Sequence, residues 1–290
     1  MPAGLEQAVW VDWRAPLPAE LTAPRVYFGH ETCERLLPSA AAISEWARSA
    51  LDRGVALTLV TPFLTNPGLD RARRLIDCLS AIDGAVEVVC SDWGLLDVLA
   101  RERAVTPVVG RLLAARPADP RLMRMFAGGR ERTLTHLDGT ACRLKHQPPG
   151  AQLARHYRGC RFDRPETISW FQSIGVRRAE IDNTGHGIDL AGFPGWWFSL
   201  HAPEVLVAVM RRCPGLGEDF GAPAACPSSR CGAPAVEWKM PGFPVALRRR
   251  QNALFYDWPD LPGNLASLPI DRIVRRERAE PTHGPDGRLT

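Results

Sequence analysis

Three cysteines lie close together late in the 290-residue chain, with the spacing C-x12-C-x4-C. They are Cys213, Cys226 and Cys231, and the residues between them are mostly Pro, Gly, Ala and Ser. A loop with so few large apolar side chains cannot be held in shape by burying apolar surface. Because thiolates are strong metal ligands, we interpret the three cysteines as ligands of a metal centre that fixes this loop.

A tetrahedral centre with three thiolates needs a fourth ligand from elsewhere in the fold. Our candidate is Cys33, which comes just after the C-terminal end of the predicted strand Arg25–Gly29. Two other cysteines fall where cysteine usually serves as a small core residue, Cys78 within a predicted helix and Cys90 at the end of an apolar strand. Cys142 and Cys160 lie in a segment without a clear pattern and stay open as ligands.

The spacing favours an iron–sulfur cluster, [4Fe–4S], over the alternatives. Zinc accepts four cysteines and often orders Gly-rich loops, but its usual C-x2-C pairs are missing. A third hypothesis is that the thiols are unconnected. The start of the chain lacks a basic segment followed by an apolar one, so we expect a cytoplasmic protein with reduced thiols or metal ligands in place of disulfides.

Short apolar strands alternate with amphipathic helices along most of the chain, which predicts a parallel sheet. Roughly seven or eight strands over this length favour a (β/α) TIM-barrel-like fold, complete or irregular, over an open sheet. No G-x-G-x-x-G follows a strand, which weakens a dinucleotide-binding alternative. The expected strands are 25–29, 56–61, 86–90, 107–110, 178–182, 196–201, 253–257 and 270–274, and the expected helices are 38–52, 69–80, 93–103, 165–174 and 203–212.

These elements predict three regions. Residues 1–24 form an N-terminal strand or cover, residues 25–275 form a single barrel-like iron–sulfur domain, and the charged, Pro- and Gly-rich residues 276–290 form a disordered tail. Within the barrel domain, residues 123–164 are an irregular insertion, because Gly and Pro punctuate them.

A closed barrel explains how the distant cysteines meet, because its first and last strands are neighbours and all loops after strands emerge on one face. Four residues at strand ends on the same face are candidate catalytic residues: Asp92, Arg111, Asn183 and His201. Arg111 could bind a carboxylate through two hydrogen bonds, or equally hold a neighbouring loop or pair with Asp92. His201 could transfer protons or be a hydrogen-bonded core residue.

Composition argues against several functions. The net charge is only +4 and Lys145 and Lys239 are the only lysines, so a nucleic-acid partner is not expected. No run of about 18 apolar residues occurs, so we expect no membrane span. The sequence contains no P-loop, no H-E-x-x-H and no recognisable Ser-His-Asp order, so nucleotide-dependent and hydrolytic mechanisms are not indicated.

Several phrases in a fixed order resemble a known family. They are V-Y-F-G-H-E-T-C, T-P-F-L-T-N-P-G, S-D-W-G-L-L-D-V-L, P-V-V-G-R-L-L, F-Q-S-I-G-V-R-R-A-E-I-D-N and S-L-H-A-P, followed by the three-cysteine loop. Together they resemble the UbiU/UbiV-type branch of the collagenase-like (U-32) peptidase family, closest to its shorter UbiV-like members. The likeness covers most of residues 25–275. The last cysteine spacing, x4 where x3 is usual, and S-D-W-G in place of N-D-W-G depart from the family pattern.

The resemblance implies a barrel that binds one [4Fe–4S] cluster through Cys33, Cys213, Cys226 and Cys231. It implies a role in oxygen-independent hydroxylation of a ubiquinone or other small aromatic precursor, with a homologous UbiU-like protein as heterodimer partner and prephenate as a candidate oxygen donor. A non-catalytic cluster-bearing partner subunit and an RNA-base hydroxylase are the alternatives. Proteolysis is not expected, because the extra cysteine-containing signature of the long peptidase members is missing.

Overall fold

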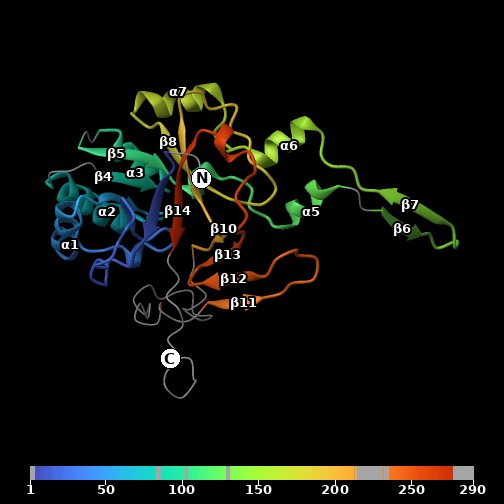
Figure 1. Ribbon diagram of the computed structural model, residues 1–290, viewed down its shortest axis with the longest axis horizontal. Coiled ribbons are helices and arrows are strands. Elements are labelled where there is room, and N and C mark those ends of the chain that lie inside the picture. The colour runs from blue at the N-terminus through green and yellow to red at the C-terminus, as the bar shows by residue number, and fades with distance from the viewer. Residues whose placement is uncertain are drawn as a thin grey trace, which may run out of the picture.

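A closed barrel of eight parallel strands forms the centre of the molecule (Figure 1). The structure is a computed structural model, and it describes residues 4–82, 86–101, 104–128, 131–211, 213, 231 and 235–276. The strands follow one another around the barrel as β1 (Glu6–Trp10), β2 (Arg25–Gly29), β3 (Ala56–Val60), β4 (Val86–Cys90), β5 (Val105–Val109), β8 (Arg178–Asp182), β9 (Trp197–His201) and β14 (Ile270–Arg276). The predicted (β/α) barrel is therefore confirmed.

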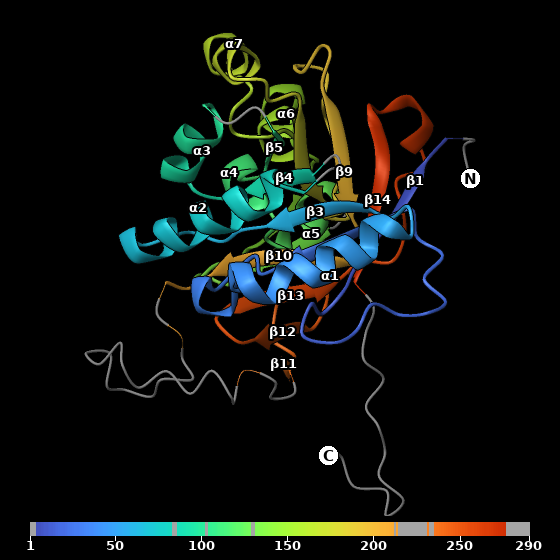
Figure 2. The same cartoon turned by 90° about the vertical axis from the view of Figure 1, so that its left-hand side faces the viewer.

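Helices lie on the outside of the barrel, where the chain passes from one strand to the next (Figure 2). They are α1 (Ala40–Asp52), α2 (Asn66–Ser80), α3 (Trp93–Leu99), α4 (Arg111–Ala114) and α7 (Pro165–Ser173). Helix α1 begins after Ser39, whose side chain accepts a hydrogen bond from the amide of Ala42. Its apolar residues recur at helical spacing, so Ile43, Ala47 and Ala50 are all buried against the barrel.

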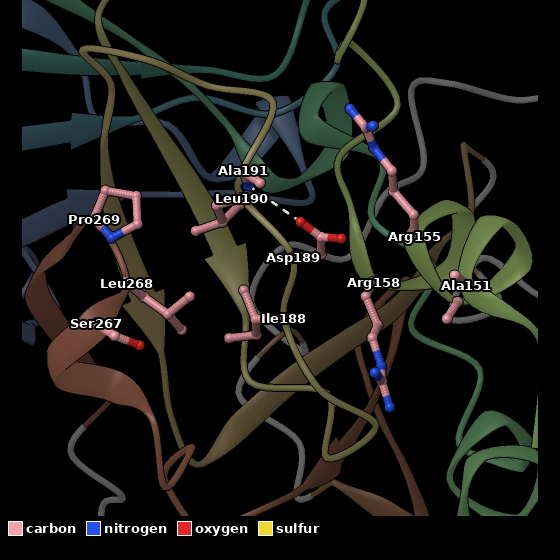
Figure 3. Close-up of a pocket in the computed structure, with 11 residues that line it drawn as sticks. Ala151, Arg155, Arg158, Ile188, Asp189, Leu190, Ala191, Ser267, Leu268 and Pro269 are labelled. Carbon is pink, nitrogen blue, oxygen red and sulfur yellow. Dashed lines mark hydrogen bonds between the residues drawn. The ribbon is translucent and has the colours of Figure 1, made fainter.

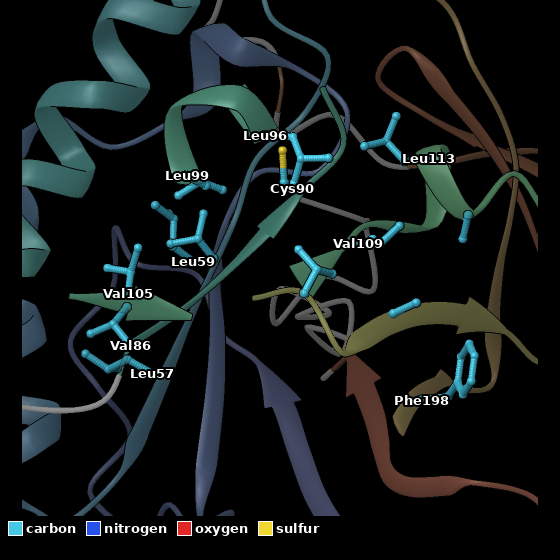
Figure 4. Packing of buried hydrophobic residues seen from close by; sticks show 14 of the residues in the cluster. Leu57, Leu59, Val86, Cys90, Leu96, Leu99, Val105, Val109, Leu113 and Phe198 are labelled. Carbon is cyan, nitrogen blue, oxygen red and sulfur yellow. The ribbon is translucent and has the colours of Figure 1, made fainter. Parts of the chain in front are cut away.

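The main core fills the space between the strands and these helices. Figure 4 shows part of it, where leucines and valines of β3, β4 and β5 pack with Leu96 and Leu99 of α3. Cys90 lies in this cluster and is fully buried, as predicted for a small core residue. A second, smaller core lies inside the barrel and includes Tyr27 and Val108. Strand residues alternate between these two cores because successive side chains point to opposite faces.

The segment expected to be irregular contains regular elements. It holds α5 (Arg121–Ala127), a hairpin of β6 (Glu131–Thr135) and β7 (Ala141–Lys145), and α6 (Ala151–Arg158). Figure 1 shows the hairpin projecting from the body of the molecule beyond α5 and α6. Short strands with few apolar residues and many turn residues explain why the sequence pattern was unclear there.

Two expectations about the sheet were wrong. Residues 203–212 were expected to be helical, but β10 (Glu204–Val209) is a strand, since its alternating valines suit an extended chain. Strand β13 (Ala253–Asp257) does not close the barrel, because it pairs antiparallel with β10 and with β12 (Leu247–Arg250). The N-terminal residues, expected to form a strand or a cover, contain strand β1, which pairs with β14 and β2 and so completes the barrel.

The small antiparallel sheet has the order β10-β13-β12-β11, with β11 at Val236–Trp238. It lies at the C-terminal end of the barrel, beside the arrowhead of β14 in Figure 1. Single turns of 3-10 helix occur at Glu34–Leu36 and Leu265–Ser267. In the part of the chain that the structure describes, no helix is both long and apolar enough to cross a membrane.

Candidate functional site at the barrel mouth

Buried and partly buried ionisable side chains gather at the C-terminal end of the barrel, which we call the mouth. They come from the ends of barrel strands, from the loops after them and from the small sheet, and they are Glu31, Arg111, Asp182, His201, Glu204, Arg250 and Arg276. Barrel enzymes place their reactive groups at this end. The mouth is therefore the first place to look for the site predicted from the sequence.

Arg111 is held by two carboxylates of its own chain. Its Nε donates to Glu31 Oε1 at 2.7 Å, its Nη1 donates to Asp182 Oδ1 at 2.6 Å, and its Nη2 donates to the second oxygen of Glu31. Burial would raise the pKa of Glu31, but Arg111 lowers it. Burial would lower the pKa of Arg111, but the carboxylates of Asp182 and Glu31 raise it. Its guanidinium thus joins the loop after β2 to the end of β8, and its partners are Glu31 and Asp182 rather than Asp92.

A second ion-pair group at the mouth carries more positive charge than its carboxylate can balance. Glu204 accepts from Arg250 Nη1 at 2.7 Å, and Arg276 Nε lies 3.4 Å from it. Burial would raise the pKa of Glu204, but Arg276 and Arg250 lower it to about 2. Burial and the neighbouring Arg250 lower the pKa of Arg276 to about 10. Arg250 and Arg276 thus share the Glu204 carboxylate at this side of the mouth.

His201 forms a buried pair with a glutamate that the sequence analysis missed. Its Nε2 lies 2.6 Å from Glu180 Oε2, and the other oxygen of Glu180 accepts from the Tyr27 hydroxyl at 3.0 Å. Arg272 in turn donates to the Tyr27 hydroxyl at 2.9 Å. Glu180 could have been found from the pattern R-A-E-I-D, because a carboxylate at an inward-facing position of a buried strand needs a partner.

The other two predicted catalytic residues hold loops. Asp92 is the N-cap of α3 and accepts from the amides of Gly94 and Leu95, while its second oxygen accepts from the amide of Leu64. Asn183 is buried, and its side-chain nitrogen donates to the carbonyl of Asp260 at 2.9 Å. Both side chains are thus engaged with backbone groups. Of the four predicted residues, the structure brings only Arg111 and His201 into the charged mouth.

A short turn joins the segments that carry three of the predicted metal ligands. The Asn252 side-chain nitrogen donates to the carbonyl of Thr32 at 2.6 Å and to that of Met210 at 2.8 Å. The neighbouring Gln251 donates from Nε2 to the carbonyl of Cys231 at 3.1 Å. Thr32 directly precedes Cys33, and Met210 lies three residues before Cys213. The backbone around all three cysteines is therefore fastened to one turn at the barrel mouth.

The fourth predicted ligand, Cys226, lies outside the described residues. Within the ranges that are described, no three His, Cys, Asp or Glu side chains converge closely enough to hold a metal ion. Cys33, Cys213 and Cys231 are each partly exposed, so their thiols are accessible. Cys142 is exposed on the hairpin, whereas burial raises the pKa of the Cys160 thiol to about 12, which disfavours the thiolate that a metal needs.

His30 shapes the turn that presents Cys33. Its Nδ1 accepts hydrogen bonds from the amides of Thr32 and Cys33, at 3.3 and 3.0 Å. Burial, together with the charges of Arg276 and Arg250, lowers the pKa of His30 to about 3, so the ring is neutral at pH 7 and can accept at Nδ1. His30 thus acts on the backbone of the ligand loop.

A shallow pocket on the side of the barrel is lined by α6, the loop before β9 and the residues that precede β14 (Figure 3). Its volume is about 460 Å³. Ser267, Leu268 and Pro269 come before the first residue of β14, so the pocket lies away from the mouth. None of the predicted catalytic or metal-ligating residues lines it.

Comparisons with known proteins find only distant structural likenesses. No protein-family model matches the chain, and no curated protein matches it significantly. Among solved structures, the U32 peptidase Mk0906 is similar over 95% of this chain and 94% of its own, with 12% identity and a TM-score of 0.42. Streptococcus suis SuiB bound to S-adenosylmethionine is similar over 68% of this chain and 38% of its own, with 14% identity and a TM-score of 0.30. Likenesses this distant carry no argument about function.

Proposed function

We propose that the protein binds a [4Fe–4S] cluster through Cys33, Cys213, Cys226 and Cys231 at the barrel mouth. The observation that carries the proposal is the Gln251–Asn252 turn, which fastens the backbone around Cys33, Cys213 and Cys231. A cluster with four thiolate ligands carries net negative charge, and the nearby Arg250 and Arg276, which share the Glu204 carboxylate, suit it.

We further propose that the protein takes part in oxygen-independent hydroxylation of a ubiquinone or other small aromatic precursor, together with a homologous UbiU-like partner and with prephenate as oxygen donor. The support is the sequence resemblance combined with the site at the mouth. When bound, the cluster would supply one-electron transfer. His201 would hold or move a proton at its ring, and Glu180 would orient that ring and stabilise its charged form.

A non-catalytic, cluster-bearing partner subunit is the second candidate. It is favoured by the hydrogen bonds of Arg111, because the guanidinium nitrogens that donate to Glu31 and Asp182 are not available to a substrate carboxylate. Asp92 and Asn183 likewise hold backbone groups. In this case the barrel mouth would stabilise the cluster and the complex, and only the partner would hold substrate.

The test of the cluster is anaerobic purification, with iron and acid-labile sulfide measured alongside the visible spectrum. Cys→Ala changes at each of the four positions should abolish most iron and sulfide, while Cys142→Ala, on the exposed hairpin, should leave both unchanged. Zinc without sulfide, or equal iron in all five variants, would reject the cluster.

The two candidates are separated by His201→Asn and Glu180→Gln, assayed with the partner. An active chain should lose at least about a hundred-fold in turnover, the low end of what general acid–base groups contribute, with iron content and complex formation unchanged. Unchanged turnover in both variants would favour the non-catalytic subunit.

A further inference from the structure

We infer that a groove beside the barrel mouth, distinct from the cysteine site, binds a small planar aromatic anion that carries a hydroxyl or N–H donor. The groove lies between α5, the end of α6, the loop after β8 and Trp258, and its volume is about 700 Å³. This inference does not depend on the proposed function, because neither the cysteines nor His201 lines the groove.

The walls of the groove suit an aromatic ring. Phe126, Trp258 and Met123 line it, and the ring of Phe126 stacks on that of His186 with centroids 5.6 Å apart and planes 17° apart. A side chain at Gly185 would collide with the Trp258 ring, since a Cβ there would lie 2.6 Å from it. The loop after β8 therefore packs closely against the indole and leaves a flat, partly apolar wall.

The charge of the groove suits an anion. Its lining includes Arg124 and Arg158 and contains no carboxylate. Arg158 Nε donates to the carbonyl of His186 at 2.7 Å, while its terminal nitrogens make no hydrogen bond within the described part of the chain. Figure 3 shows the Arg158 side chain extending away from Asp189, so that carboxylate does not neutralise it. The Arg158 guanidinium carbon lies 4.4 Å from the centroid of the Phe126 ring, and the two terminal N–H groups beside that ring are available to a carboxylate or phosphate.

A buried acceptor supplies the third feature. His186 Nε2 lies 3.1 Å from the carbonyl of Tyr157, which can only accept, so Nε2 carries the proton and Nδ1 is a bare acceptor. Nδ1 is buried and has no hydrogen-bond partner among the described residues, and His186 as a whole is only 3% exposed. A ligand donor that approached in the plane of the imidazole would satisfy Nδ1, whereas Phe126 covers the face of the ring.

The test is calorimetric titration of the full-length protein with the three hydroxybenzoate isomers, with benzoate, which lacks the donor, and with phenol, which lacks the anion. At least one hydroxybenzoate should bind about ten-fold more tightly than either simpler compound, the effect of one good hydrogen bond or ion pair. Absence of binding at millimolar concentrations, or equal affinity for all the compounds, would overturn the inference.

Variants locate the binding. Arg158→Gln and Arg124→Gln should each weaken hydroxybenzoate binding about five-fold or more, and His186→Phe, which keeps the stacking on Phe126, should remove the preference over benzoate. Among the residues that the structure describes, Arg124 makes one long hydrogen bond, 3.4 Å to the carbonyl of Phe243, so its variant tests the anion site even if Arg158→Gln does not fold.

Arg121→Gln is the matched control, because Arg121 lies on the same helix, pairs with Asp119 and does not line the groove. Equal weakening in the Arg121 variant, or unchanged affinity in the Arg124 variant, would contradict the proposed site.

Discussion

The two ends of the barrel both contain buried networks of arginines and carboxylates, but they are built from different parts of the chain. At the N-terminal end, Arg272 donates to Glu6 at 2.6 Å and to Glu87 at 2.7 Å, and all three residues belong to barrel strands. At the mouth, the partner Glu31 lies just beyond the end of β2, on the segment that leads to Cys33, and the partner Glu204 is the first residue of β10 in the small sheet.

The electrostatic balance also differs between the two ends. Glu87, Tyr27 and Glu180 raise the pKa of Arg272 against the effect of burial, which shows that its charge is well compensated. Arg276, on the same strand at the other end, has its pKa lowered to about 10, with burial and Arg250 as the main causes. The N-terminal network therefore serves the barrel itself, whereas at the mouth Arg276 and Arg250 share one carboxylate, Glu204.

The largest effects are expected when one carboxylate is removed from each end of the barrel. Glu87→Gln and Glu31→Gln should each lower the free energy of unfolding by about 3–5 kcal/mol, because each leaves a buried arginine short of a partner. Only Glu31→Gln should also reduce iron retention, since Glu31 lies two residues before Cys33. Urea unfolding and iron analysis check this, and equal iron loss in both variants would erase the distinction.

The link between the mouth and the cysteine segments is tested by Asn252→Ala. The change leaves two buried carbonyls without a donor, so the free energy of unfolding should fall by about 2 kcal/mol and iron should be lost faster to a chelator. Asn264→Ala is the matched control, because the Asn264 side chain makes no capping hydrogen bond. Chelation rates that do not change in Asn252→Ala would show that the turn does not support the site.

The loops of the mouth should also make the stability of the protein depend on pH between 7 and 5. Burial, then Arg116, lowers the pKa of His186 to about 4 from an ordinary value of 6.5, so between these values the unfolded chain binds more protons. Stability is thus full above about pH 6.5 and falls as the pH drops toward 4, by up to about 1.4 kcal/mol per unit. Urea unfolding from pH 7 to 5 should give a smaller slope for His186→Asn, with His30 supplying part of the remainder. An identical slope would refute this source.

The smallest effect is expected at a strand end that lies outside the charged mouth. Asp92→Ala removes the cap of α3 and should cost about 1 kcal/mol of stability, with iron content and turnover unchanged. Asp70→Ala, at an exposed position where the nearest arginine nitrogen is 3.9 Å away, should cost less than about half of that. Loss of turnover in the Asp92 variant would instead support the predicted catalytic role of Asp92.

Sequence reasoning succeeded where local pattern decides structure. Strands β2, β3, β4 and β8 were found because short buried runs end at turn residues, and their order predicted the barrel. It failed for β10, because the run V-L-V-A-V is too short to distinguish the period of a strand from that of a helix. The partners of Arg111 could not be predicted, because Glu31 lies 80 residues away and no local signal selects it over other carboxylates. The cluster itself stays a prediction.

Strand β14 supplies an arginine to each end of the barrel, and it follows the seven other barrel strands in the sequence. Glu6 can pair early with Arg25, but its pairing with Arg272 must wait until that residue emerges 266 residues later, and β1 and β9 have no neighbour on one side until then. Because such distant pairings are slow to form, ribosome-bound chains should expose two open strand edges for most of translation. The yield of folded protein in cells is therefore expected to depend on chaperones that bind extended segments more strongly than the stability of the folded protein would suggest.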